Sequence, residues 1–216
     1  MIKDEVIRNT VEFVKKELEN DYTGHDFWHI HRVTTMSKKI AKIENANGYI
    51  CELAALLHDV ADEKLIDNED EGIKKIENFL EENQVDNEDI KHIIEIISTM
   101  SYKGGTNKKA MRTLEGKIVQ DADRLDAIGA IGIARCMCYT GAKQRPIYEP
   151  NENIRENMTL DEYRSNKGNA INHFYEKLLK LKGQMNTKTA KELAEGRHKF
   201  LEEFLDNFHM EWNGQK

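Results

Sequence analysis

Apolar residues recur every three or four positions along most of this chain of 216 residues. That spacing is typical of helices that bury one face and leave the other in water. Residues 49–60 are apolar nearly all round, which predicts a helix at the centre of the core. The spacing also predicts helices at residues 2–18, 27–43, 70–82 and 87–100, a long stretch at 113–137 that can break in two, and two C-terminal helices within 168–211.

Segments without helical spacing separate these helices, at residues 101–110 and 139–166. The only two prolines, Pro146 and Pro150, both fall in the second segment. So few helix breakers indicate an all-α fold. Because no linker, internal repeat or low-complexity tract interrupts the pattern, we expect a single compact helical domain over residues 1–216.

Composition narrows the class of protein. Charged residues make up 33% of the chain, the net charge is −7 and the mean hydropathy is −0.72, as in globular proteins with solvated faces. The acidic balance argues against a nucleic-acid polymer as partner. No apolar run reaches the roughly 20 residues of a membrane span, residues 1–10 do not resemble a signal peptide, and the three cysteines suit a reduced compartment. We expect a cytoplasmic protein with no membrane partner; the sequence does not predict its oligomeric state.

One predicted helix ends in an unusual pair of residues. The apolar run at 54–57 leads directly into an imidazole and a carboxylate, His58 and Asp59. Burying either group alone is costly, by several kcal/mol for the ionised acid. A hydrogen bond, an ion pair or a metal ion must offset that cost.

Two further stretches carry polar residues into apolar surroundings. His29 lies on the apolar stripe of its predicted helix and therefore faces inward. Asp121, Asp123 and Asp126 lie among isoleucine, alanine, valine, leucine and glycine at residues 119–135. Taken one at a time, a buried histidine is usually a satisfied core residue, and a helical aspartate usually caps a helix or pairs with an arginine.

Taken together, these residues suit a metal ion better than separate structural roles. Histidine and aspartate from three helices form a set that a divalent cation can compensate. Two imidazoles with two carboxylates favour a transition metal over calcium or magnesium. We expect one divalent ion, manganese first, with iron, cobalt, nickel, zinc or magnesium as alternatives.

The order His29, His58–Asp59, Asp123 resembles the H…HD…D signature of the HD-domain metal-dependent phosphohydrolases. The resemblance extends from about residue 20 to residue 210. It is closest to a small bacterial branch, some of whose members are nucleoside triphosphate pyrophosphohydrolases. The segments that carry it are HDFWHIHRV (25–33), LLHDVADEK (56–64), VQDADRLDAIGAIGIAR (119–135) and HFYEKLLKLK (173–182).

This resemblance implies a compact helical bundle with the metal ion in its middle, in a core of about residues 20–140. The ligands it implies are His29, His58, Asp59 and Asp123. Asp126 lies on the same helix face as Asp123, so it is expected either to support the ligands or to replace Asp123 among them. Asp121 points away from Asp123 in a regular helix and is the least favoured of the three aspartates as a metal ligand.

The resemblance also implies an acid one turn beyond the paired ligands. Asp62 is expected to activate water or transfer a proton, with Glu63 as the second choice. The alternative is an exposed acid at a helix end, paired with Lys64.

Phosphoryl transfer places negative charge on oxygen atoms, so cationic side chains are expected around the site. Two loops, 101–110 and 139–166, supply lysine and arginine, although a solvated surface loop is an equal alternative for each single residue. The expected substrate-binding residues are His25, Arg32, Lys103, Lys143 and Arg145.

We therefore expect a metal-dependent phosphohydrolase that converts a nucleoside triphosphate to monophosphate and pyrophosphate by attack of an activated water. A nucleotide monophosphatase or a phosphodiesterase is the alternative enzyme, since the same ligand set serves all three. A non-catalytic nucleotide-sensing module is the alternative of another class.

Overall fold

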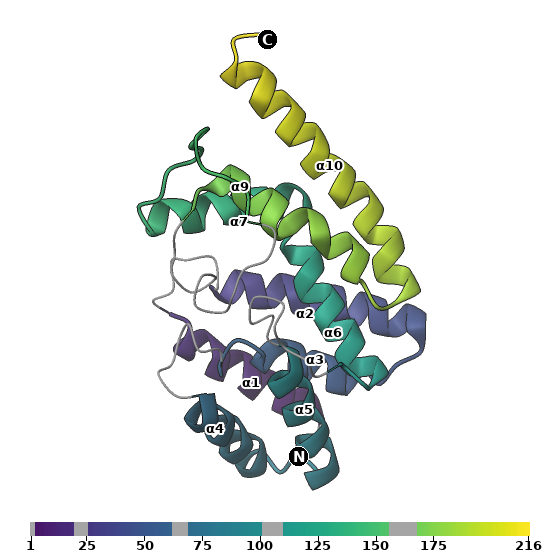
Figure 1. Cartoon of the computed structure of the whole chain (residues 1–216). Helices are drawn as coiled ribbons and strands as arrows, with labels where there is room; N and C mark the ends of the chain where they lie inside the picture. The colour runs from purple at the N-terminus through teal and green to yellow at the C-terminus, as the bar shows by residue number, and fades with distance from the viewer. Residues whose placement is uncertain (1–2, 20–25, 62–68, 101–109, 156–167) are drawn as a thin grey trace. The chain divides into compact units, whose positions relative to one another are not determined.

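The structure is a computed structural model that describes residues 3–19, 26–61, 69–100, 110–155 and 168–216 (Figure 1). Within these ranges every regular element is helical, which confirms the predicted all-α fold. The chain forms two compact units, residues 1–122 and 123–216. The expectation of a single domain stays a prediction.

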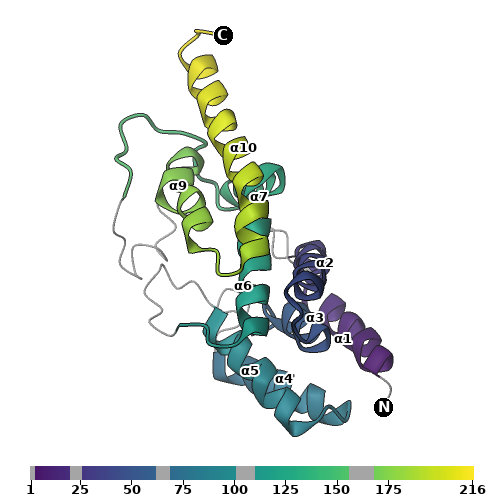
Figure 2. The same ribbon diagram turned by 90° about the vertical axis from the view of Figure 1, so that its right-hand side faces the viewer.

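The first unit is built around α3 (Gly48–Leu57), whose side chains are almost all buried. Both α1 (Lys3–Glu17) and α2 (Phe27–Glu44) pack on α3, and α5 (Asn87–Met100) packs on it as well. The helix α4 (Glu69–Glu82) lies beside α5 in both views (Figures 1 and 2). The prediction that this apolar segment is central is therefore confirmed.

Capping residues fix where α2 and α3 begin. The Asp26 carboxylate accepts a hydrogen bond from the backbone N–H of His29 at 2.9 Å and so starts α2. Asn47 caps α3 in the same way, through the N–H groups of Tyr49 and Ile50. The backbone N–H of Asn47 donates to Glu115 at 2.9 Å, which ties the start of α3 to α6 (Leu114–Asp126).

The second unit contains the end of α6, then α7 (Gly129–Ala142), α9 (Ala170–Glu176), the 3₁₀ helix η2 (Leu178–Gln184) and α10 (Lys188–Trp212). The long helix α10 packs on α7 and η2. A break between η2 and α10 divides the helical region predicted within residues 168–211.

A sharp corner separates α6 from α7, so the long stretch at 113–137 does break into two helices. Gly129 has a φ of +77°, and a Cβ there would meet Arg197 of α10 at 3.1 Å. Gly129 and Gly132 predict close approach of a neighbouring helix, and Gly129 confirms it. Gly132 differs, because a Cβ at this position would lie 2.3 Å from the carbonyl oxygen of Ala127. This glycine therefore allows the backbone to turn between α6 and α7.

Two predicted boundaries shift by a few residues. The central helix ends at Leu57 rather than at residue 60, and His58 and Asp59 follow in a turn. The helix α7 continues to Ala142, so the irregular segment begins at residue 143 rather than 139.

An ion pair holds the segment after α7 against α9. The Arg155 guanidinium donates to both carboxylate oxygens of Glu176, at 2.8 and 2.7 Å, and the Arg155 backbone N–H adds a third hydrogen bond. The Glu176 side chain is 1% exposed and that of Arg155 is 30% exposed. Such a bidentate pair holds the two side chains in one relative orientation, because both planar groups must align. It therefore contributes geometric specificity as well as stability.

The described helices include none that is both long and apolar enough to cross a membrane.

The cysteines differ in their accessibility and therefore in their expected reactivity. Burial raises the pKa of Cys51 to about 12 and that of Cys136 to about 11, whereas Cys138 is exposed. Since the thiolate is the reactive form, we expect Cys138 to react with Ellman's reagent at least about a hundredfold faster than the other two. Thiol release at mildly alkaline pH measures this, and Cys138→Ser should remove the fast phase. A fast phase that survives in that variant contradicts the expectation.

Candidate metal centre

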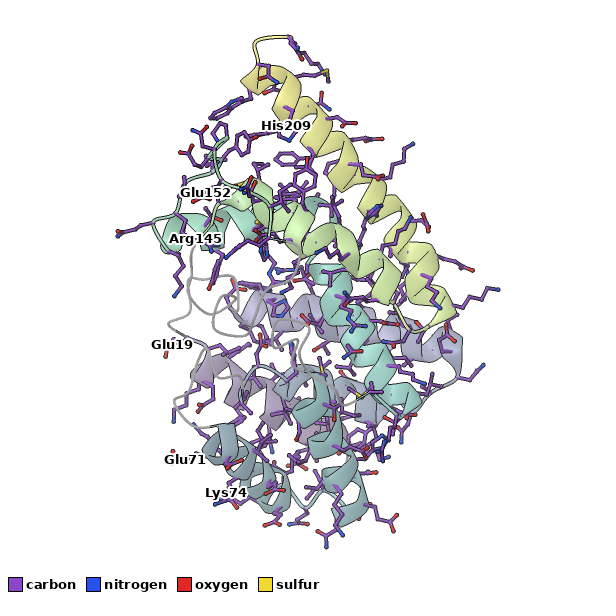
Figure 3. The ribbon with its side chains drawn as sticks, viewed as in Figure 1. Glu19, Glu71, Lys74, Arg145, Glu152 and His209 are labelled. Atoms are coloured by element: carbon purple, nitrogen blue, oxygen red, sulfur yellow. The ribbon has the colours of Figure 1, made fainter. Side chains whose placement is uncertain are left out.

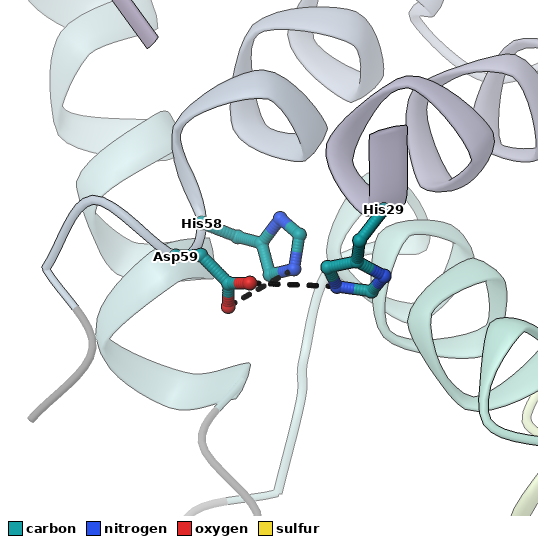
Figure 4. A group of neighbouring side chains, drawn as sticks. All are labelled: His29, His58 and Asp59. Atoms are coloured by element: carbon teal, nitrogen blue, oxygen red, sulfur yellow. Dashed lines mark ion pairs between the residues drawn. The ribbon is translucent and has the colours of Figure 1, made fainter. Parts of the chain in front are cut away.

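Two elements of the first unit bring three predicted ligands together (Figure 4). His29 comes from the first turn of α2, and His58 and Asp59 come from the turn that directly follows α3. Nε2 of His29 lies 3.4 Å from Oδ2 of Asp59, and Nε2 of His58 lies 3.3 Å from Oδ1 of the same carboxylate. The two imidazole rings have centroids 5.3 Å apart. Both Nε2 atoms thus face one carboxylate.

A backbone hydrogen bond orients the His58 ring. Its Nδ1 lies 2.8 Å from the carbonyl oxygen of Ala55. A carbonyl oxygen can only accept, so Nδ1 carries the proton and donates it. In the neutral imidazole the lone pair is then on Nε2, which is the nitrogen that faces Asp59. This tautomer presents the Nε2 lone pair to the cluster, where it can bind a metal ion.

The cluster is nearly excluded from water. His29 is 0% exposed, His58 9% and Asp59 4%. Burial disfavours an ionised carboxylate unless positive charge or hydrogen-bond donors compensate it. The carboxylate-to-imidazole distances of 3.3 and 3.4 Å exceed the roughly 2.7–2.9 Å of a charge-assisted hydrogen bond. A cation bound between the three groups would place positive charge beside the carboxylate.

The spacing of the donor atoms fits a divalent metal ion. One ligand atom from each residue can be chosen so that all lie within 4.8 Å of one another. Metal–ligand bonds of about 2.1 Å at right or tetrahedral angles separate neighbouring donor atoms by ~3.0–3.4 Å. Each imidazole Nε2 lies at this spacing from the Asp59 carboxylate, His29 at 3.4 Å from Oδ2 and His58 at 3.3 Å from Oδ1. The cluster could therefore hold a metal ion.

Comparison with known proteins gives the family. A model of the HD domain family matches residues 27–128, a span that includes all three clustered residues. YpgQ, an uncharacterised protein of Bacillus subtilis, is 39% identical over 194 residues, which cover 89% of this chain and 87% of YpgQ. The chain belongs to the HD domain family.

Solved structures extend this likeness over the whole chain. A protein from Lactobacillus plantarum has a TM-score of 0.87 at 41% identity, and the match covers 99% of this HD protein and 100% of that chain. An HD-superfamily hydrolase from Bacillus thuringiensis has a TM-score of 0.78 at 47% identity with the same coverage. The crystal structure of YpgQ in complex with ADP has a TM-score of 0.79 at 37% identity, covering 98% and 97% of the two chains. This chain is accordingly a hydrolase of the HD superfamily.

The three aspartates of the predicted fourth-ligand group differ in their surroundings. Asp123 is half-buried on α6, in the part of that helix that belongs to the second unit. Its assignment as the fourth ligand of this HD hydrolase stays a prediction. Asp121 is fully buried on the part of α6 that belongs to the first unit.

Asp126 takes part in an ion pair within the second unit. Its carboxylate accepts a hydrogen bond from Nη1 of Arg135 at 3.0 Å, which ties α6 to α7. Burial lowers the pKa of Arg197, and the negative charge of Asp126 acts in the opposite direction. Both sequence alternatives for Asp126, support of the ligands or replacement of Asp123 among them, stay predictions.

The remaining predicted residues fall in different places. Arg32 is half-buried on α2, one turn beyond His29. Lys143 and Arg145 follow α7 in the second unit and both approach the Tyr139 ring. The other four predicted site residues lie outside the described residues and stay predictions: His25, Asp62, Glu63 and Lys103.

Sequence reasoning missed the groups that position the site. The Ala55 carbonyl is a backbone group and leaves no signal in the side-chain pattern. The bond from Asn47 to Glu115 joins residues 68 positions apart, so no local spacing reveals it. An Asn directly before the apolar run of α3 does predict a cap, and that cap is present.

Proposed function

We propose that this HD hydrolase converts nucleoside triphosphates into nucleoside monophosphates and pyrophosphate. The observation that carries the proposal is the buried cluster of His29, His58 and Asp59, in which one donor atom from each residue lies within 4.8 Å of the others. The ADP complex of the relative YpgQ supports a nucleotide as the ligand. The net charge of −7 supports a small nucleotide over a nucleic-acid polymer.

We infer that His29, His58, Asp59 and Asp123 hold one divalent ion. The nitrogen and oxygen ligand set suits manganese, iron, cobalt, nickel or zinc, and we propose manganese. When bound, such an ion supplies water of lowered pKa and polarises a phosphoryl oxygen.

The remaining chemistry is assigned to the chain's own side chains. We assign Asp62, with Glu63 as the alternative, to accept the proton of the attacking water. The water oxygen forms a bond to the α-phosphorus, and the bond from that phosphorus to the α–β bridging oxygen breaks. The electron pair leaves with pyrophosphate, so cationic groups must compensate the charge that develops there. We assign that task to His25, Arg32, Lys103, Lys143 and Arg145.

A product assay tests the reaction. Purified protein is incubated with Mn²⁺ and a panel of nucleoside triphosphates, diphosphates, monophosphates and cyclic nucleotides, and the products are separated by anion exchange. We expect monophosphate and pyrophosphate in equal amounts from the triphosphates, and no turnover after metal removal with EDTA.

The alternative functions give other products in the same assay. Free phosphate from monophosphates indicates a monophosphatase, and opening of cyclic nucleotides indicates a phosphodiesterase. Nucleotide binding without turnover under any divalent metal ion indicates a sensing module. Each of these results overturns the proposed reaction.

A further inference from the structure

Two cationic side chains gather on one aromatic ring at the end of α7. Nζ of Lys143 lies 5.7 Å from the centroid of the Tyr139 ring, and the guanidinium carbon of Arg145 lies 5.4 Å from it. Both distances are within the range of a cation–π contact. Arg145 is labelled in Figure 3, in the second unit.

The backbone turns Arg145 back towards α7. Gln144 has a φ of +54°, in the left-handed region, and the backbone N–H of Arg145 donates to the carbonyl oxygen of Thr140 at 3.0 Å. This arrangement ends the helix and directs the next residue over its last turn. Arg145 is therefore half-buried against the helix rather than extended into solvent.

The charges of Lys143 and Arg145 have no carboxylate counterpart in the part of the chain that the structure describes. Nε of Arg145 is also buried there with no hydrogen-bond acceptor. A helix C-terminus attracts cations, and this accounts for Lys143 at the C-cap of α7. It does not account for a buried guanidinium nitrogen without an acceptor, which is unfavourable.

A third cation contributes to the positive potential in this region. Burial raises the pKa of the Cys136 thiol, and the charges of Arg145 and Lys177 act against that rise. The positive charges of Arg145 and Lys177 therefore both act on Cys136 of α7.

We propose that Lys143 and Arg145, held on the Tyr139 ring, form a binding site for the phosphate groups of the substrate. That the anion is the phosphate chain of a nucleotide rests on the proposed function. A guanidinium matches two phosphate oxygens at once, and the lysine adds a point charge. The ring restricts both long side chains before the anion arrives, which reduces the entropy lost on binding.

These contacts give the three residues different roles in binding the anion. Arg145 supplies the directional hydrogen bonds, Lys143 supplies charge, and Tyr139 acts only as a positioning residue through its π face. The hydroxyl group of Tyr139 has no part in this scheme. Phenylalanine should therefore replace tyrosine without loss, whereas an aliphatic residue should not.

Isothermal titration of pyrophosphate into the metal-free, full-length protein in EDTA separates this site from the metal centre. We expect Arg145→Gln to weaken binding at least about tenfold, and Lys143→Gln by a smaller factor. Tyr139→Leu should weaken binding about threefold to tenfold, and Tyr139→Phe should leave it unchanged. The exposed Lys188→Gln is the matched control for loss of one positive charge. Circular dichroism and thermal melts confirm that each variant is folded.

The outcomes distinguish this inference from the proposed reaction. Absence of pyrophosphate binding to the metal-free protein, or equal binding by Arg145→Gln and wild type, overturns the phosphate site. Loss of binding in Tyr139→Phe overturns the role of the ring. If nucleotide turnover fails under every metal ion while pyrophosphate binding still depends on Arg145, the reaction is wrong and the anion site stands.

Discussion

Replacing Asp59 with alanine is expected to abolish metal binding and to lower turnover at least about a thousandfold. The Asp59 carboxylate is the group that both imidazole Nε2 atoms face, at 3.4 and 3.3 Å. Without it the cluster keeps two neutral nitrogen donors and loses its negative charge. Metal content by mass spectrometry of the purified protein and the product assay measure the two effects.

Two further variants separate loss of the metal ion from loss of the fold. Asp59→Asn keeps the shape of the side chain and removes its charge, so it should be folded and still lack metal. Asp206→Ala removes an exposed carboxylate on α10 and should leave both metal content and rate unchanged. Normal hydrolysis by Asp59→Ala would show that the site assignment is wrong.

The variant Arg155→Ala is expected to lower the free energy of unfolding by about 3–5 kcal/mol. It removes the guanidinium that meets both oxygens of Glu176, and that carboxylate is 1% exposed. The loss reflects the uncompensated buried charge more than the net strength of the pair. Urea denaturation followed by circular dichroism measures it.

An exposed ion pair and an apolar replacement serve as controls. Lys188→Ala breaks a pair whose side chains are 87% and 68% exposed, and it should change stability by less than about 0.5 kcal/mol. Replacing Arg155 with methionine and Glu176 with leucine together should recover much of the loss, because no buried charge then remains. A loss below about 1 kcal/mol for Arg155→Ala alone would contradict this account of the pair.

Most helices follow from the sequence because each buries one face or, for α3, nearly all of its surface. The corner between α6 and α7 is harder to locate. Gly129 and Gly132 indicate close approach, but the sequence does not say that one meets Arg197 of α10 and the other the Ala127 carbonyl. Those contacts depend on the tertiary packing of residues far apart in the chain.

The candidate site shows the same division. His29 and the pair His58–Asp59 stand out because polar residues in apolar helices need a partner, and the structure brings them together. The Ala55 carbonyl that orients His58, and the Tyr139 ring that contacts Arg145, could not be predicted from the sequence. Both contacts depend on the folded backbone and not on a pattern of residue types. The ion pair of Asp126 with Arg135 was one of several pairings that the sequence allowed.

Anomalous diffraction from crystals grown with excess manganese tests the central claim most directly. We predict one strong anomalous peak at about 2.1–2.3 Å from Nε2 of His29, Nε2 of His58 and a carboxylate oxygen of Asp59. A well-ordered structure with these side chains in place and no anomalous density between them would contradict the account.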